Sequence, residues 1–201
     1  MALENKLGLT SSADLAREEE RISKKKAVQL YESGRLDQLT PGTVPALQEI
    51  HRILFEEIYD FAGKIRTVNL AKGNFRFAPV LYLESALHSI EQMPQSTFEQ
   101  IVEKYVEMNI AHPFREGNGR SMRIWLGPDA EKGAGPGGDW SLVNREDYLL
   151  AMERSPVRDT ELKLLLKNAL TDAVDSREVF LKGIDHSYEY EGYTAFRAEE
   201  L

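Results

Sequence analysis

The stretch from His112 to Arg123 constrains the fold of this chain more than any other; it reads His-Pro-Phe-Arg-Glu-Gly-Asn-Gly-Arg-Ser-Met-Arg. The turn Gly117-Asn118-Gly119 can point successive backbone N–H groups into one concavity, and a helix that begins there adds the positive end of its dipole. Arg120 and Arg123 are three residues apart, so they project from one side of that helix. The stretch therefore predicts a loop that opens a helix and binds an anion.

The other residue types of the stretch suit the phosphates of a nucleotide. Guanidinium groups bind phosphate oxygens in a bidentate way. Glu116 is a hard oxygen ligand of the kind that Mg²⁺ prefers, and His112 has an ordinary pKa close to that needed of a general base. The alternative is a tight turn whose glycines supply positive φ and whose histidine caps a helix. That alternative leaves the carboxylate and both arginines without a role.

Residues 112–123 resemble the signature of Fic domains, His-x-Phe-x-Asp/Glu-Gly-Asn-Gly-Arg-x-x-Arg, at every fixed position. The resemblance implies an all-α, mainly helical Fic fold with a short β-hairpin, the flap, in one domain over residues 1–201. It also implies a nucleotidyltransferase that moves AMP from ATP to a hydroxyl of a protein target. In that activity His112 would take the proton and Glu116 would hold Mg²⁺. The nucleotide would be bound by Lys72, Asn109, Gly117, Asn118, Gly119, Arg120 and Arg123.

Composition is ordinary for a soluble globular protein, with 42% hydrophobic and 29% charged residues in 201. The absence of cysteine excludes a disulfide framework and a thiolate metal site. A net charge of −8 argues against direct binding of nucleic acid, which needs a cationic face. No apolar run has the length of a membrane span or of a signal-peptide core, so we expect a cytoplasmic protein with no membrane partner.

Helical periodicity and capping residues predict most of the remaining elements. The run Lys24-Lys25-Lys26 is interpreted as a solvated helix face, and His51 as a packing residue. A capping box at Ser96-x-x-Glu99 predicts the helix that delivers His112, which Pro113 ends. Helices are expected from Ser11 toward Gly34, from Pro45 to Gly63, from Leu83 to before Pro94, from Asn144 to Pro156, from Glu161 to Val174, and from Asp175 to Gly183.

Residues 63–79 differ from this helical pattern, because two β-prone runs flank a turn at Ala71-Lys72-Gly73-Asn74. One interpretation is a structural ribbon packed by its phenylalanines. The other is that the exposed edge pairs with an extended segment of a protein target. The stretch resembles the Fic flap, in which Lys72 would lie near the phosphates; an ordinary surface lysine is the alternative.

The segment 127–138 is rich in Gly and Pro and predicts a loop where the helix behind the motif would otherwise continue. Here the chain departs from the family pattern. The segment is interpreted as an inserted loop or as a short out-of-frame stretch. If the broken helix has removed catalysis, the chain is a nucleotide-sensing binding module instead of an enzyme.

Near the C-terminus, Ser187 and Glu191 are four residues apart and followed by Gly192, which predicts one helix face. Spacing alone favours a capped acidic terminal helix. The stretch is also similar to the Fic inhibitory motif, Ser/Thr-x-x-x-Glu-Gly/Asn, on a helix at about 184–192, as in the self-inhibited class III. The resemblance implies that Glu191 pairs with Arg123 and denies it to the γ-phosphate. Tyr188 and Tyr190 are plausible self-modification sites.

Several readings remain open at this level. Related enzymes move phosphate or phosphocholine, and Glu191 could also position a water for AMP removal, which would make the enzyme reversible. The glycines and arginines of the motif favour an ordinary ATP orientation. Relatives suggest a bacterial topoisomerase subunit as the target, and the oligomeric state, a homo-oligomer included, is open.

Overall fold

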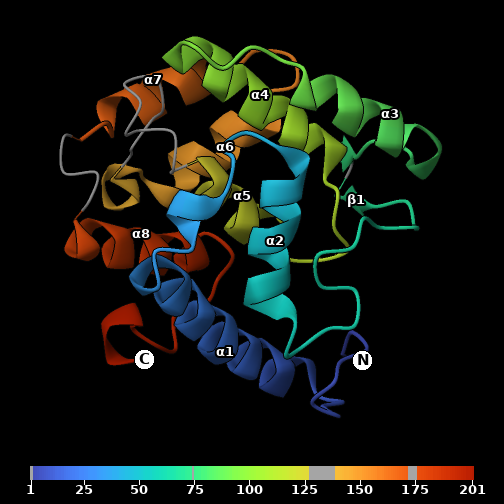
Figure 1. The fold of residues 1–201 in the computed structure, drawn as a ribbon, viewed down its shortest axis with the longest axis vertical. Coiled ribbons are helices and arrows are strands. Elements are labelled where there is room, and N and C mark those ends of the chain that lie inside the picture. Colours follow the sequence, from blue (N-terminus) through green and yellow to red (C-terminus); the bar gives the residue numbers. More distant parts are fainter. Residues whose placement is uncertain (1, 74, 127–138, 172–175) are drawn as a thin grey trace.

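The computed structural model describes residues 2–73, 75–126, 139–171 and 176–201. In these ranges the chain is mainly helical and carries one two-stranded antiparallel hairpin, which confirms the expected fold class (Figure 1). The predicted loop 127–138 lies outside the described residues. The elements are α1 Ser12–Glu32, η1 Leu36–Gln38, α2 Val44–Phe55, β1 Ala71–Lys72, β2 Phe75–Arg76, α3 Val80–Glu91, α4 Phe98–Ala111, α5 Asn118–Leu126, η3 Trp140–Leu142, α6 Arg145–Arg154, α7 Thr160–Asn168, α8 Arg177–Glu189 and η4 Ala198–Glu200.

Helix α5 lies at the centre of the molecule, in contact with α2, α4 and α8 (Figure 1). Its apolar side chains Met122, Ile124 and Trp125 are buried in the main hydrophobic core. Arg120 and Arg123 of the same helix are buried as well. Because the candidate motif runs directly into this central helix, its loop is fixed by packing on three sides.

Side-chain caps fix the starts of several helices where the sequence places them. Ser11 accepts from the Asp14 N–H to begin α1, and Asn144 accepts from two N–H groups to begin α6. The capping box of α4 is one residue later than predicted, because Thr97 and Gln100 bond each other's backbone N–H groups. This difference leaves the C-terminal end of α4, and hence His112, where the sequence predicts it.

Three predicted helix ends were wrong. Helix α2 ends at Phe55 instead of Gly63, and residues 56–63 form turns. Helix α7 ends at Asn168 instead of Val174. Helix α8 continues through Gly183 to Glu189 and so joins two segments predicted separately. A Cβ on Gly183 would lie 3.5 Å from a Trp140 ring atom, so this glycine serves close packing instead of ending the helix.

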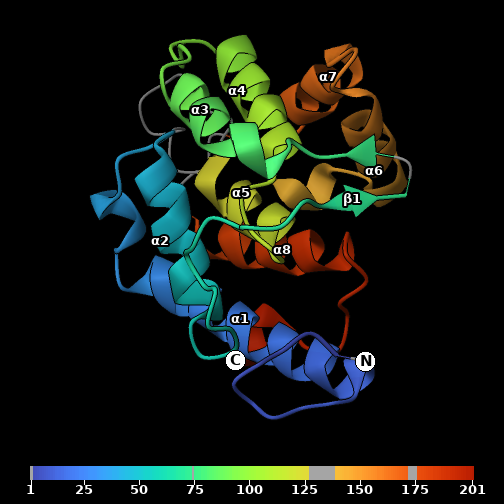
Figure 2. The same cartoon turned by 90° about the vertical axis from the view of Figure 1, so that its right-hand side faces the viewer.

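The interpretation of Lys24 as part of a solvated face was also wrong. Its side chain is 1% exposed, and Nζ lies 3.1 Å from both Glu20 Oε1 and Asp185 Oδ1. It also donates to the Phe196 carbonyl at 2.7 Å. A buried ammonium needs such partners, because desolvation is costly for an unpaired charge. The contacts bind α8 and the C-terminal segment to α1 (Figure 2).

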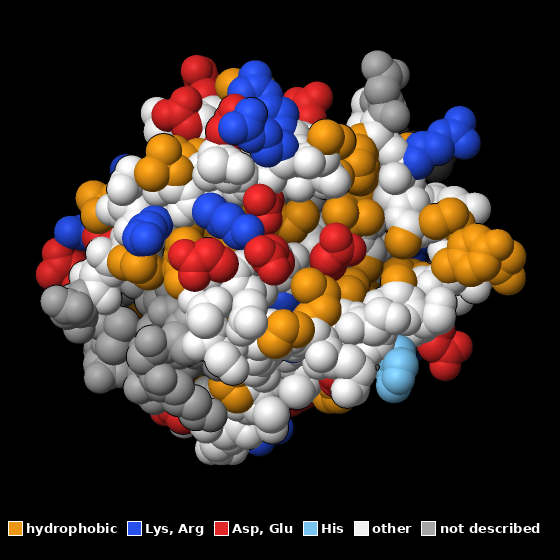
Figure 3. Space-filling model, turned by 90° about the horizontal axis from the view of Figure 1, so that it is seen from above, with side chains coloured by type: hydrophobic (Ala, Val, Ile, Leu, Met, Phe, Trp, Pro, Cys, Tyr) orange, Lys and Arg blue, Asp and Glu red, His pale blue; other side chains and the backbone are white. Residues whose placement is uncertain are grey.

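The hairpin is shorter than the predicted span of 63–79. Its two-residue strands pair Ala71 with Arg76 and Lys72 with Phe75, and Figure 2 shows it at the edge of the molecule. On the face seen from above, acidic and basic side chains are interspersed (Figure 3). Among the described residues, no helix combines the length and apolar character that a membrane span requires.

Candidate functional site

His112 caps the C-terminal end of α4 in a left-handed conformation, with φ 49° and ψ 64°. Among the described residues it is the only non-glycine with positive φ. Its N–H still bonds the Met108 carbonyl at 2.9 Å, and Pro113 prevents the helix from continuing. A left-handed non-glycine residue costs roughly 1–3 kcal/mol and persists only where surrounding contacts hold it. The chain therefore fixes His112 at the junction of helix and loop.

The imidazole of His112 is neutral at pH 7 and has a defined tautomer. Nδ1 lies 3.3 Å from the Asn109 carbonyl, which can only accept, so Nδ1 carries the hydrogen and Nε2 keeps its lone pair. Burial lowers the pKa of His112 to about 4. The ring stacks on Phe77, next to the hairpin, with centroids 3.7 Å apart. Nε2 can therefore accept a proton, but the lowered pKa makes it a weaker base than the ordinary imidazole that the sequence predicts.

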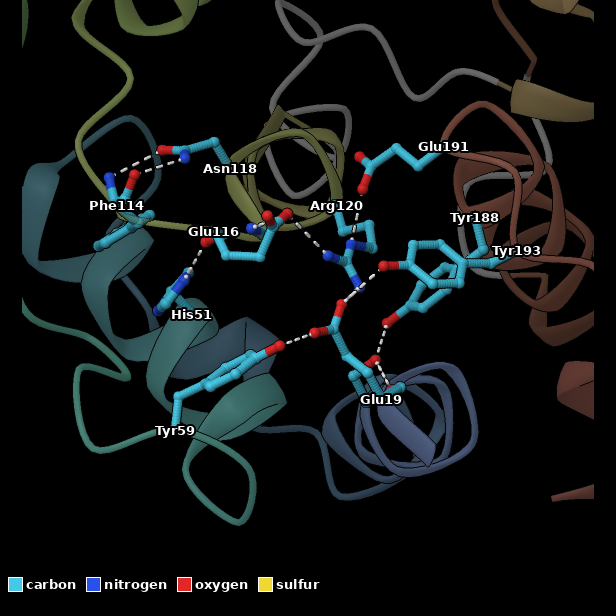
Figure 4. Close-up of polar contacts among 12 residues, drawn as sticks. Glu19, His51, Tyr59, Phe114, Glu116, Asn118, Arg120, Tyr188, Glu191 and Tyr193 are labelled. Atoms are coloured by element: carbon cyan, nitrogen blue, oxygen red, sulfur yellow. Dashed lines mark hydrogen bonds and ion pairs between the residues drawn. The ribbon is translucent and has the colours of Figure 1, made fainter. Parts of the chain in front are cut away.

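The loop after His112 is held by side chains instead of being free to follow a ligand. Asn118 bonds both backbone groups of Phe114, donating to its carbonyl at 2.7 Å and accepting from its N–H at 2.8 Å (Figure 4). Phe114 is fully buried and stacks on the ring of His51 at 3.8 Å. The Asn118 side chain thus shapes the loop, while its backbone N–H begins α5.

His51 has a role that sequence reasoning missed. Its Nδ1 accepts from the Gly63 N–H at 2.8 Å, so Nε2 carries the hydrogen and donates to the Glu116 carbonyl at 2.8 Å. Burial lowers the pKa of His51 to about 3. The residue packs in the core, as interpreted, and in addition anchors the candidate loop. Helical periodicity alone contains no signal for that second contact.

Arg120 is fully buried and surrounded by carboxylates from three parts of the chain (Figure 4). Its guanidinium lies 2.5 Å from Glu19, 2.8 Å from Glu191 and 3.3 Å from Glu116. Glu19 of α1 also accepts from the Tyr193 hydroxyl at 3.0 Å. Glu19 was absent from the sequence-predicted site, since it stands in a run of three glutamates on a charged helix.

Arg123 is bound by the residues of the C-terminal motif. Its Nε donates to Ser187 Oγ at 2.6 Å, and its Nη2 lies 2.7 Å from Glu191 Oε1. Burial would raise the pKa of Glu191, but Arg120 and Arg123 outweigh that effect and keep it below the ordinary value. The carboxylate of Glu191 is therefore ionised and bridges both arginines of the motif.

The two glycines of the motif leave room for this arrangement. Gly117 has φ +74°, and a Cβ there would lie 2.4 Å from the Phe55 ring. A Cβ on Gly119 would lie 2.5 Å from Glu191 Oε1 and 2.8 Å from Arg123 Nη1. The surface over Gly119 is thus the place where the Glu191 carboxylate sits.

The residues that could hold a metal are few. The Glu116 side chain is 46% exposed, and its Oε1 accepts from the Gly117 N–H at 2.9 Å. No group of three or more acidic or histidine side chains arranged for a metal is found among the described residues. A single carboxylate fits Mg²⁺, which keeps waters and takes other ligands from substrate phosphates.

Lys72 is exposed on β1.

The two tyrosines predicted as self-modification sites are not accessible in this conformation. Tyr188 is fully buried, and its hydroxyl donates to Ser23 at 2.8 Å. Tyr190 is 3% exposed and donates to the Val143 carbonyl at 2.9 Å. Both side chains pack α8 against its neighbours, so modification would require that end of α8 to detach.

The fold and site together define a mainly helical domain in which the carboxylate of Glu191 covers the start of α5 at Gly119 and pairs with both arginines of the motif. Residues 41–127 match the model of the Fic/DOC family, so this segment is similar to Fic domains. The chain is 31% identical over 187 residues to protein adenylyltransferase VbhT of Bartonella schoenbuchensis, covering 87% of this chain and 38% of VbhT. The chain is 27% identical to the probable protein adenylyltransferase Fic of Salmonella typhimurium, covering 85% and 88%. Both relatives carry the name protein adenylyltransferase, and the chain spans well under half the length of VbhT.

Solved structures share the fold. The Fic domain of Bep8 from Bartonella sp. 1-1C superposes with a TM-score of 0.71 at 19% identity, covering 86% of this chain and 92% of that one. BepC from Bartonella tribocorum, solved with bound AMPPNP, has a TM-score of 0.66 at 18% identity, covering 85% and 93%. At these identities the similarity establishes the architecture alone.

Proposed function

We propose that this chain is a protein adenylyltransferase, which transfers AMP from ATP to a hydroxyl of a target protein and is held inhibited by Glu191. The observation that carries the proposal is the pairing of two features on one loop. His112 offers a neutral Nε2 lone pair at one end. At the other end, Arg120 and Arg123 bind a carboxylate where an anionic ligand would bind.

In the proposed reaction the target's hydroxyl oxygen attacks the α-phosphorus of ATP. The bond from that phosphorus to the oxygen bridging to the β-phosphate breaks, and pyrophosphate leaves. The hydroxyl proton passes to Nε2 of His112, which is neutral at pH 7 and therefore able to accept it. Nδ1–H remains bonded to the Asn109 carbonyl, which keeps the ring oriented through the transfer.

The remaining motif residues would bind and orient the phosphates. Arg123 is the guanidinium most directly released when Glu191 leaves, because Arg120 stays bonded to Glu19. Asn118 would act through its backbone N–H and the loop shape, since its side chain is occupied by Phe114. Catalysis would then consist chiefly of positioning and electrostatic stabilisation.

Glu116 is the residue that would hold Mg²⁺. When bound, the ion would offset negative charge on the phosphates. Lys72, exposed on the hairpin, is proposed to contribute a further positive charge on the His112 side of the loop. A target segment would dock along the hairpin edge by strand pairing. The identity of the target, a topoisomerase subunit included, stays a prediction.

Inhibition is proposed to be direct competition for Arg123. The Glu191 carboxylate occupies the guanidinium and the space over Gly119, and Ser187 holds the same guanidinium from α8. A charge-assisted hydrogen bond to a carboxylate and one to a phosphate use the same donors. A triphosphate with an ordinary orientation would therefore have to displace Glu191.

The test of the proton acceptor is His112→Ala, with His88→Ala as the matched control because His88 is exposed on α3. In a Glu191→Gly background, labelling of lysate proteins from α-labelled ATP is expected to be abolished by His112→Ala and unchanged by His88→Ala. ATP binding, measured by calorimetry, is expected to remain in both. Undiminished labelling by the His112→Ala protein would contradict the assignment.

A further inference from the structure

Arg66 lies between α2 and the hairpin and is 5% exposed. No carboxylate is paired with it among the described residues; its guanidinium donates to backbone carbonyls instead. Nε bonds His112 at 2.7 Å, and Nη1 bonds Val68 at 2.7 Å. Nη2 bonds Ala78 at 2.5 Å and Ala111 at 3.0 Å. One buried side chain thus serves four acceptors.

These four carbonyls belong to two structural units. Val68 and Ala78 stand on either side of the hairpin strands, so the guanidinium closes the base of the hairpin. Ala111 is the last residue of α4 and His112 is its cap. The last carbonyls of a helix have no intrahelical partner and carry partial negative charge, which a cation stabilises. Arg66 therefore binds the hairpin base to the end of α4.

Neighbouring contacts join the same two units. The Arg66 N–H bonds the Pro113 carbonyl at 2.8 Å, and the Ala78 N–H bonds the Ile110 carbonyl at 3.0 Å. Phe77, adjacent to Ala78, stacks on the His112 ring. A displacement of the hairpin base is thus transmitted to the ring that would accept the proton.

The geometry requires arginine rather than any cation. A guanidinium presents five N–H donors in a planar fork, four of which are used here, whereas an ammonium presents three donors at one point. Burial lowers the pKa of Arg66, which reflects the cost of desolvating its charge. An apolar side chain would fill this volume without that cost, so filling space is not what the residue provides.

We infer that Arg66 is a positioning residue that fixes the hairpin and His112 relative to each other, so that a target hydroxyl presented by the hairpin meets the imidazole. The effect of Arg66 on AMP transfer rests on the proposed function. Its role in holding the hairpin base against the end of α4 rests on the contacts alone. Within the motif 112–123, the hydrogen bonds of Arg66 go to the backbone carbonyls of His112 and Pro113 alone, and neither carbonyl is proposed to bind ATP.

The activity test compares Arg66→Lys and Arg66→Ala with Arg154→Lys and Arg154→Ala, all in the Glu191→Gly background. Arg154 is the matched control, because it is exposed on α6 and pairs with Glu161. At saturating α-labelled ATP, incorporation into lysate proteins is expected to fall at least about tenfold in both Arg66 variants, since small misplacements of reacting groups have large effects. The ATP concentration for half-maximal rate is expected to stay within about twofold.

A second measurement does not depend on activity. Hydrogen exchange should accelerate in Arg66→Lys at the amides of residues 66–73, 75–78 and 110–112, while α1 and α7 exchange as in the parent protein. Unchanged exchange in these segments, or equal acceleration everywhere, would overturn the inference. An unchanged labelling rate in a folded Arg66 variant would also overturn the inference. So would a variant that keeps the full labelling rate but needs a higher ATP concentration to reach half of it. If the Glu191→Gly parent transfers nothing, the proposed function fails and exchange alone decides the role of Arg66.

Discussion

Arg120 and Arg123 lie three residues apart on one helix, yet their surroundings differ. Arg123 contacts mainly the C-terminal motif, whereas Arg120 is also bonded to Glu19, more than a hundred residues earlier in the chain. Residue type and spacing predict that both guanidinium groups face one side. They carry no information on partners contributed by α1, which is why the buried state of Arg120 was not predicted.

The contacts of His51 likewise could not be predicted from residue type and spacing. Its burial can be tested through the pH dependence of stability. Burial lowers its pKa to about 3 in the folded chain, from an ordinary value of 6.5. As pH falls, His51 is therefore protonated in the unfolded chain before it is protonated in the folded chain, which favours unfolding. The stability that the neutral His51 contributes is complete above pH 6.5 and is lost between pH 6.5 and about 3. Between pH 7 and pH 5 the loss from His51 is expected to be about 2 kcal/mol.

Urea unfolding at the two pH values measures this loss. Between pH 7 and pH 5, the free energy of unfolding of the His51→Gln protein should fall by about 2 kcal/mol less than that of the unmodified chain. His88→Gln, on the exposed face of α3, should behave as the unmodified chain does. Equal pH dependence in the His51→Gln protein would show that the ring is not held neutral by burial.

At the scale of elements, local patterns predicted the helices because caps and apolar periodicity are properties of neighbouring residues. The starts of α1 and α6 follow from Ser11 and Asn144. The ends were less predictable: Gly183 resembles a helix stop and is used for packing on Trp140. The hairpin was predicted in place but too long, since pairing needs partners on both strands.

The buried contacts between α1, α8 and the C-terminal segment make a prediction about stability. Lys24→Met would leave the carboxylates of Glu20 and Asp185 without their ammonium. Removing one partner of a buried ionic network typically destabilises by roughly 3–5 kcal/mol. Urea unfolding at pH 7 should show such a loss for Lys24→Met. Lys182→Met, which removes an exposed ion pair on α8, should leave the midpoint unchanged.

For the whole molecule, the site depends on segments far apart in the sequence. Helix α1 supplies Glu19, α5 supplies Arg120 and the turn after α8 supplies Glu191, and these three side chains meet at one point (Figure 4). Arg123, also on α5, pairs with the same Glu191 carboxylate. The pairing of Glu191 with Arg123 was expected from the family resemblance and not from spacing. The bridge from Glu191 to Arg120 was not expected, and it strengthens the proposed block of the phosphate site.

The central claim is that Glu191 restrains an otherwise competent AMP transferase. The most direct measurement is incorporation of label from α-labelled ATP into lysate proteins with Mg²⁺, comparing the unmodified chain with Glu191→Gly. Glu189→Gly is the matched control, because Glu189 ends α8 two residues before Glu191 and contacts neither Arg120 nor Arg123. Since hydrogen bonds between charged groups contribute roughly 1.5–3 kcal/mol, Glu191→Gly is expected to raise labelling at least about tenfold and Glu189→Gly to leave it unchanged. Equal labelling by the unmodified chain and a folded Glu191→Gly protein, or none by either, would contradict the claim.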